Sequence, residues 1–246
     1  MQLRSADTFT DSLSKLTGDE QKAVKTTAFD LQMNPVNPGM SFHKLDRAKD
    51  KNFWSVRVSR DIRLIVHKTD SSLLLCYVDH HDPAYRWAER RKLQTHPKTG
   101  AAQIVEVREV VEEIRVQKVV EEAAPAPSKP KLFTHLTEDQ LLGFGVPPEW
   151  LDAVTVADED QLLSLSEHLP SEASEILLEI ATGGAVPQAP TPRPENESPF
   201  DHPDAQRRFR TIKDSDELAL ALDFPWDKWT IFLHPDQRDL VTKSFS

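Results

Sequence analysis

The spacing of the apolar residues changes near residue 53. It is mainly helical before this point and alternates every second residue after it, so helices are predicted first and strands afterwards. Apolar side chains recur at helical spacing over residues 9–16, and the capping-box sequence Thr17-Gly-Asp-Glu20 opens a second predicted helix. Asn34-Pro35 should end that helix, because the residue before a proline is disfavoured in the helical conformation. A short strand is expected at residues 2–4. The first part of the chain therefore predicts one strand followed by two helices.

Residues 53–79 alternate between apolar and polar side chains, which favours β-strands. Arg60-Asp61 and residues 69–72 supply turns, so we predict three antiparallel strands joined by tight connections. A helix is expected after His80-His81, with Pro83 in its first turn. Together these elements predict an α+β fold in which helices pack on an antiparallel sheet.

Two proline-rich stretches organise the chain beyond residue 100. Residues 123–131 and 183–203 have the composition of extended linkers. Between them, a capping box at Thr137 and the prolines at 147–148 predict a small helical unit. About 50 residues make a marginal core on their own, so we expect this unit to pack against a neighbouring part of the protein.

The last part of the chain is expected to be ordered again, with a strand at 209–212 and a helix over 214–222 before an aromatic-rich tail. Residues 104–122 fit either a strand or a helix. The predicted regions are an α+β domain at 1–100, a connector at 101–131, a helical domain at 132–182, a linker at 183–206 and a C-terminal helical and aromatic segment at 207–246.

The composition excludes several classes of protein. Hydrophobic residues make up 38% of the 246, enough for a core in part of the chain. The sequence has no apolar run of about 18 residues that would span a bilayer, and the N-terminus lacks a secretory pattern. The single cysteine, Cys76, excludes an internal disulfide or a Cys-rich zinc site. We therefore expect a soluble, cytoplasmic protein without a membrane partner.

Charge is distributed unevenly along the chain. The net charge is −10, yet residues 1–100 carry 17 Lys and Arg against 12 Asp and Glu. A basic N-terminal part suits the phosphate backbone of a nucleic acid. The alternative interpretation is an ordinary solvated charged face.

A series of short motifs runs through the first 92 residues. They are the Asn-Pro-x-x-Pro-Gly turn at 34–39, His-Lys-Leu at 43–45, Trp-Ser-Val-Arg-Val at 54–58, Asp-Ile-Arg-Leu-Ile-Val at 61–66 and the segment 78–85. Their order resembles the RelE-like toxin superfamily of small ribonucleases. The resemblance covers more than a third of the chain and implies a RelE-like α+β domain.

In that superfamily, basic side chains on the sheet hold an RNA phosphate, one group acts as an acid and an aromatic ring stacks on a base. By position, the resemblance implies that Arg57 and Arg63 clamp the phosphate, His81 is the acid and Tyr85 is the stacking residue. Guanidinium groups suit this task because they bind phosphate bidentately. Lys44 joins the two arginines as an expected nucleic-acid contact.

Two positions depart from the RelE-like pattern. Ser55 stands where many members have a catalytic lysine, and His81 stands where many have arginine. A sheet that keeps the shape without the chemistry is therefore the alternative. The His80-His81 pair also suggests a metal, but adjacent residues on a strand point to opposite faces and the sequence offers no third ligand at diagnostic spacing. No metal site is predicted, and Cys76 is expected in the core.

The C-terminal tail contains the sequence Leu233-His-Pro-Asp-Gln237-Arg238 after several aromatic residues. It resembles the Q motif at the entry of UvrD-type superfamily one DNA helicases. The resemblance implies that Gln237 and Arg238 contact a nucleotide, because a carboxamide can pair with adenine N7 and N6. The alternative is an ordinary amphipathic helix.

The resemblance implies ATP and Mg²⁺ as cofactors of a full-length helicase, but none for this chain alone. Gly-x-x-x-x-Gly-Lys-Ser/Thr does not occur among its 7 glycines, so the chain has no P-loop of its own. Whether this chain is itself an enzyme therefore stays open.

The leading hypothesis is the N-terminal accessory region of an ATP-dependent DNA helicase, with a RelE-like domain, a helical adaptor and the start of the motor. A RelE-like ribonuclease (an mRNA interferase toxin) with a C-terminal extension is the second hypothesis. A non-catalytic module that binds DNA, RNA or a partner protein is the third.

Overall fold

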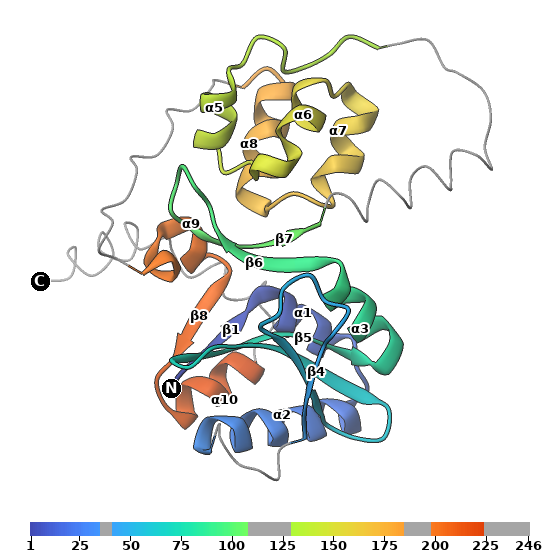
Figure 1. Ribbon diagram of the computed structural model, residues 1–246, viewed down its shortest axis with the longest axis vertical. Helices are drawn as coiled ribbons and strands as arrows, with labels where there is room; N and C mark the ends of the chain where they lie inside the picture. The colour runs from blue at the N-terminus through green and yellow to red at the C-terminus, as the bar shows by residue number, and fades with distance from the viewer. Residues whose placement is uncertain (35–40, 108–128, 185–197, 224–246) are drawn as a thin grey trace, which may run out of the picture. The chain divides into compact units, whose positions relative to one another are not determined.

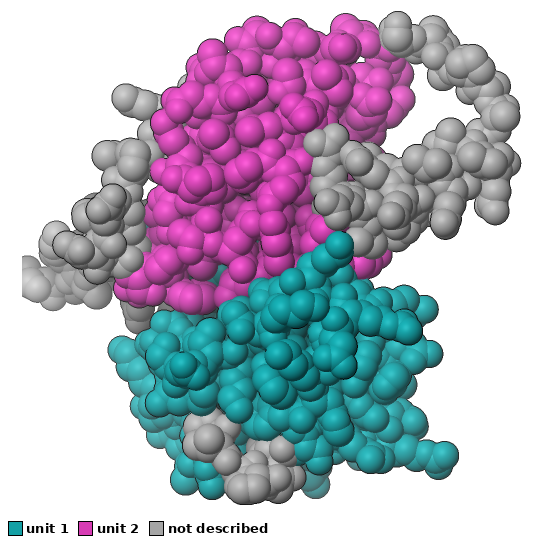
Figure 2. Space-filling model, in the orientation of Figure 1, with its two compact units in different colours: residues 1–89, 203–246 teal, residues 90–202 magenta. Residues whose placement is uncertain are grey.

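The computed structural model describes residues 1–34, 41–107, 129–184 and 198–223. The chain forms two compact units (Figure 2). Unit 1 comprises Met1–Glu89 and the segment from Pro203 onward, and unit 2 comprises Arg90–His202. Both helices and strands are present, so the fold class is α+β as predicted.

Unit 1 is built on one six-stranded sheet with the order β2-β3-β4-β5-β1-β8. The strands are β1 (Gln2–Ala6), β2 (Phe42–Lys44), β3 (Phe53–Arg57), β4 (Ile62–Lys68), β5 (Ser72–His80) and β8 (Phe209–Ile212). Strands β3, β4 and β5 are antiparallel neighbours, which confirms the prediction made from their alternation.

The sheet is mixed, and here the prediction of an antiparallel sheet was wrong. Strand β1 lies beside β5 and runs parallel to it, with Leu3 opposite Leu73. Tight turns force consecutive strands to be antiparallel, but β1 is separated from the next strand by two helices. Such a long connection permits parallel pairing.

The helices of unit 1 are α1 (Asp7–Ser14), α2 (Gly18–Met33), α3 (His81–Glu89), α9 (Pro203–Gln206) and α10 (Ser215–Asp223). The predicted capping box is present at the start of α2, where Thr17 N donates to Glu20 Oε2 at 2.9 Å. Helices α2 and α10 lie side by side against the sheet (Figure 1). The core of unit 1 joins their apolar residues to those of α1 and of one sheet face.

The opposite face of the central strands is covered by α3. Trp87 of α3 stacks on Tyr77 of β5 with ring centroids 4.8 Å apart and meets the edge of Phe53 of β3 at 5.9 Å. Alternation along the strands therefore serves two packed layers, because residues of one parity face the main core and those of the other face α3.

The C-terminal segment completes unit 1 rather than beginning a separate region at 207. Strand β8 is antiparallel to β1, with Ile212 opposite Leu3, and Leu218 of α10 is fully buried in the same core. The first unit also ends at Glu89 rather than at residue 100, because the residues from Arg90 onward pair in the sheet of unit 2.

Unit 2 is a β-hairpin with a cluster of helices. Its elements are β6 (Arg91–Thr95), β7 (Ala102–Glu106), α5 (Glu138–Gly143), the 3₁₀ turn η1 (Pro148–Trp150), α6 (Leu151–Thr155), α7 (Glu159–Ser166), α8 (Ser171–Ala181) and the 3₁₀ turn η2 (Pro199–Asp201). The predicted connector at 101–131 thus contains strand β7, and the predicted linker at 183–206 ends in the helical turns η2 and α9.

The helices predicted within 132–182 are present, and they pack against the β6–β7 hairpin. Val105 of β7 belongs to the same apolar cluster as Phe133 and Trp150, and Trp150 Nε1 donates to the carbonyl oxygen of Glu106 at 3.2 Å. None of the helices in the described part of the chain is long and apolar enough to cross a bilayer.

Candidate functional site

The turn between β3 and β4 holds the two predicted phosphate ligands together. Arg57 and Arg63 are register partners at the ends of the two strands. Arg57 Nε and Arg63 Nη1 both donate to the carbonyl oxygen of Ser59, at 3.2 and 3.1 Å. Arg63 Nη1 also donates to the carbonyls of Arg60 and Ile62. The turn carbonyls therefore fix both guanidinium groups at one place.

Most N–H groups of these two guanidiniums have no hydrogen-bond partner among the described residues. The structure gives Arg57 one such bond, from Nε, and every hydrogen bond of the Arg63 guanidinium leaves from Nη1. Arg57 is exposed and Arg63 is half-buried. The free donors form a fork of the kind that binds an anionic oxygen bidentately.

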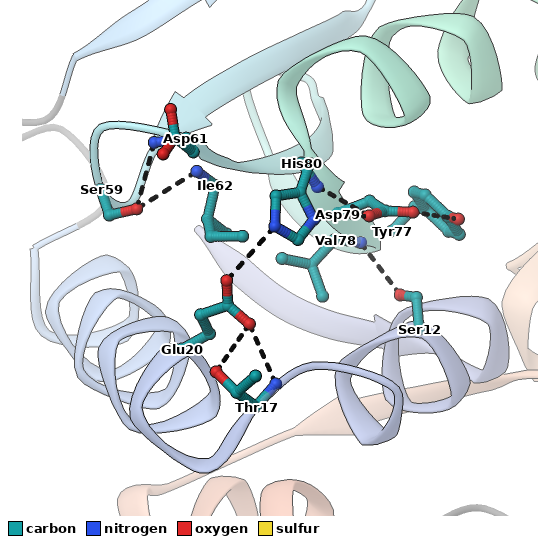
Figure 3. A network of polar contacts seen from close by, with 10 residues as sticks. All are labelled: Ser12, Thr17, Glu20, Ser59, Asp61, Ile62, Tyr77, Val78, Asp79 and His80. Carbon is teal, nitrogen blue, oxygen red and sulfur yellow. Dashed lines mark hydrogen bonds and ion pairs between the residues drawn. The ribbon is translucent and has the colours of Figure 1, made fainter.

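The Ser59 side chain shapes the turn that holds the arginines. Its Oγ accepts hydrogen bonds from the backbone N–H groups of Asp61 and Ile62, at 3.3 and 3.2 Å (Figure 3). A serine hydroxyl that bonds to backbone groups two and three residues ahead stabilises a tight turn. Sequence reasoning identified the turn but missed this role of Ser59.

His81 and Tyr85 lie at the same end of the sheet. The backbone N–H of His81, the first residue of α3, donates to the carbonyl of Asp61 at 2.8 Å. The His81 ring stacks on Tyr85 with centroids 4.3 Å apart. The Tyr85 hydroxyl is 3.0 Å from Ser55 Oγ, and Ser55 shares a face of β3 with Arg57. The structure thus brings all four RelE-derived candidates to one corner of unit 1.

Acidic groups accompany the basic ones at this corner. His81 Nδ1 donates to Asp82 Oδ1 at 2.7 Å, and this hydrogen bond lowers the pKa of the Asp82 carboxyl. Asp79 lies opposite Arg63 in the β4–β5 ladder and accepts hydrogen bonds from Tyr77 and His80. The corner therefore carries charges of both signs.

His80 also belongs to a network that connects β5 to α2 (Figure 3). Its Nε2 lies 3.3 Å from Glu20 Oε1, and the other oxygen of Glu20 accepts hydrogen bonds from Thr17. The hydrogen bonds from Thr17 are the largest cause of the lowered pKa of Glu20. His80 therefore holds secondary structure together, whereas His81 faces the arginine corner. Within the described ranges, no group of three His, Cys, Asp or Glu residues is placed to hold a metal ion.

Lys44 lies on the other face of the sheet from the arginines. It is directly opposite Trp54 in the β2–β3 ladder, so the two side chains share a face. Trp54 alternates with Ser55 and Arg57 along β3 and therefore points away from their face. The predicted nucleic-acid contacts Lys44, Arg57 and Arg63 therefore do not form one cluster, because strand parity places Lys44 on the other face of the sheet.

Cys76 is fully buried in β5, as expected for a core residue, and burial raises the pKa of its thiol. The predicted nucleotide ligands Gln237 and Arg238 lie outside the described residues. The RelE-like and helicase resemblances rest on the sequence motifs themselves. Comparison of the chain with protein-family models, with curated proteins and with solved structures gives no match in any of the three.

Proposed function

We propose that the corner formed by Arg57, Arg63, His81 and Tyr85 binds the backbone of a nucleic acid. The observation that carries this proposal is the arginine fork held on the carbonyl of Ser59, beside the stacked rings of His81 and Tyr85. Two guanidiniums with free donors suit a phosphate, and an aromatic ring at the same corner suits an adjacent base.

We further propose that this unit is part of the accessory region of an ATP-dependent DNA helicase. The Q-motif resemblance at 233–238 supports this context, and the net positive charge of residues 1–100 agrees with a nucleic-acid partner. In this proposal unit 1 contacts DNA, and unit 2 serves as a helical adaptor.

Removal of the arginine fork should weaken nucleic-acid binding. The double variant Arg57→Gln/Arg63→Gln is expected to lower the affinity for a labelled single-stranded oligonucleotide about tenfold at low salt. It should also reduce the slope of log K against log salt by about 1.4, since each phosphate contact contributes about 0.7 for single strands. Fluorescence anisotropy at salt concentrations from about 25 to about 300 mM measures both the affinity and the slope.

A matched control distinguishes binding at a specific site from general electrostatic attraction. Lys15→Gln/Lys22→Gln removes two exposed charges near the start of α2 and should change both quantities much less. Equal losses in the two double variants would show diffuse attraction, and unchanged binding by the arginine variant would contradict the proposal.

Ribonuclease activity is the second candidate, favoured by the orientation of His81. The Asp82 carboxylate accepts a hydrogen bond from Nδ1–H of this ring, so Nε2 is the nitrogen that is left for proton transfer. Incubation of the chain with RNA decides between the two functions. If RNA is cut and His81→Ala stops cleavage while binding persists, the enzyme hypothesis replaces simple binding.

The helicase context makes a prediction about ATP. The chain alone should show no measurable ATP binding by calorimetry, because two side-chain hydrogen bonds of about 0.5–1.5 kcal/mol each cannot hold a nucleotide in water. Phosphate and Mg²⁺ contacts provide most of the affinity in P-loop motors. In a protein that includes the motor, Gln237→Ala should weaken selection of ATP over other nucleoside triphosphates. Micromolar ATP binding by this chain, or an unaltered preference in the variant motor, would contradict the prediction.

A further inference from the structure

A second surface of unit 1 combines aromatic rings with lysines, on the face of the sheet opposite the arginine corner. We call it the aromatic–lysine patch, and it consists of Phe42 and Lys44 of β2, Trp54 of β3 and Lys68 of β4. The Lys68 ammonium lies 4.4 Å from the centroid of Phe42 and 5.7 Å from that of Trp54. The Lys44 ammonium lies 5.8 Å from Trp54. Two cations thus share two rings.

Both rings of the patch are only partly buried. Phe42 and Trp54 pack at the margin of the unit 1 core, as intermediate rather than fully covered side chains. The ladder places Lys44 directly opposite Trp54, so the two residues stay neighbours on one face of the sheet as long as the register holds. The patch is therefore a fixed feature of the sheet.

Neither lysine of the patch forms an ion pair with another described residue, and each ammonium has only the weak attraction of partly buried rings. The segment after Lys44 adds Arg47, Lys49 and Lys51, against Asp46 and Asp50. The surroundings of the two rings are therefore net positive.

We propose that the aromatic–lysine patch binds single-stranded nucleic acid. Bases stack on Trp54 and Phe42, while Lys44 and Lys68 move from the ring faces to the phosphates. A phosphate is a stronger partner for an ammonium than a ring, and a base replaces the ammonium on the ring. Unpaired bases are required, because a duplex keeps its base faces stacked on one another. A protein strand added to the edge of β2 would not need the lysines.

Affinity measurements on the full chain test this proposal. The probes are a labelled dT oligonucleotide, the matching rU oligonucleotide and a duplex of equal length. Lys44→Gln/Lys68→Gln should reduce the salt slope for single strands by about 1.4. Trp54→Leu should weaken binding about tenfold and leave the slope unchanged, because stacking releases no counterions. Trp54→Tyr keeps a ring and should stay close to the unchanged protein.

The variants also separate this surface from the arginine corner. A loss of affinity in the patch variants, with preference for single strands, supports the proposal, and the dT and rU probes show whether DNA or RNA is preferred. Patch variants that bind like the unchanged protein would overturn the proposal, even if Arg57→Gln/Arg63→Gln loses binding. Equal binding of duplex and single strands would overturn it as well. Phe42→Leu repeats the stacking test if Trp54→Leu fails to fold, as judged by circular dichroism.

Discussion

A chain shortened to residues 1–202 is expected to lose the folded state of unit 1, whereas a chain of residues 1–223 is expected to keep it. The shorter chain lacks β8 and α10, and these two elements cover the edge of β1 and part of the main core. An N-terminal fragment that contains every motif of the RelE-like resemblance is therefore expected to be insufficient for folding.

The magnitude of this effect follows from the buried side chains that are lost. Ile212, Leu218 and Leu222 are each more than nine-tenths buried in the unit 1 core. Burial of a side chain of this size contributes about 1.5–3 kcal/mol, so the three together contribute roughly 5–9 kcal/mol. This amount is comparable with the total stability of a small domain, about 5–15 kcal/mol. The unpaired edge of β1 adds a tendency to aggregate.

Circular dichroism and amide hydrogen exchange on the two shortened chains measure the effect. Fast exchange throughout 2–80 in the shorter chain is the expected result, with protection retained in the longer one. The point variant Leu218→Ala tests the same contact within the whole chain and should cost about 2–5 kcal/mol. A chain of residues 1–202 that unfolds cooperatively with unchanged stability would show that β8 and α10 are dispensable.

The variant Glu106→Gln is expected to destabilise unit 2 by about 3 kcal/mol at neutral pH. Glu106 is buried at the end of β7, and its carboxylate contacts three basic side chains. His168 Nδ1 donates to Oε2 at 2.7 Å, Arg90 donates to the same oxygen at 3.3 Å, and Arg91 donates to Oε1. Removal of the negative charge leaves the basic groups without compensation.

The pH dependence of this contribution follows from the pKa of Glu106. Burial alone would raise that pKa, but the hydrogen bond from His168 and the charges of Arg91 and Arg90 outweigh it and hold the pKa below the ordinary value of 4.5. A carboxyl with a lowered folded-state pKa stabilises the fold above its unfolded-state pKa, and this contribution is lost as pH falls through the lowered value. The difference between Glu106→Gln and the unchanged protein should therefore shrink in acid.

Urea unfolding at pH 7 and at about pH 3 measures this difference, with hydrogen exchange to assign it to residues 90–202. Asp139→Asn is the control, because its ion pair with Lys98 lies at the surface and such pairs contribute little. A Glu106→Gln variant as stable as the Asp139→Asn variant would contradict the expected role of the buried carboxylate. A difference that is the same at both pH values would contradict its electrostatic origin.

The arginine corner shows how far reasoning from residues reaches toward a site. The RelE-like resemblance selects Arg57, Arg63, His81 and Tyr85 as candidates, and the structure places them at one end of the sheet. Alternation along one strand shows which of its own residues share a face. It does not show which residues of another strand lie on that same face. Lys44 was therefore grouped with the arginines, although the β2–β3 register places it with Trp54 on the other face.

The sequence by itself determined the local elements of this protein, because capping boxes, turn residues and side-chain period act within a few positions of each other. The helix from Gly18, the strands within 53–79 and the strand Phe209–Ile212 follow from such signals. Only the tertiary structure decided which strand lies beside β1 on each side. Pairing of Leu3 with both Leu73 and Ile212 depends on contacts between distant segments, and apolar periodicity is the same whichever partner a strand finds.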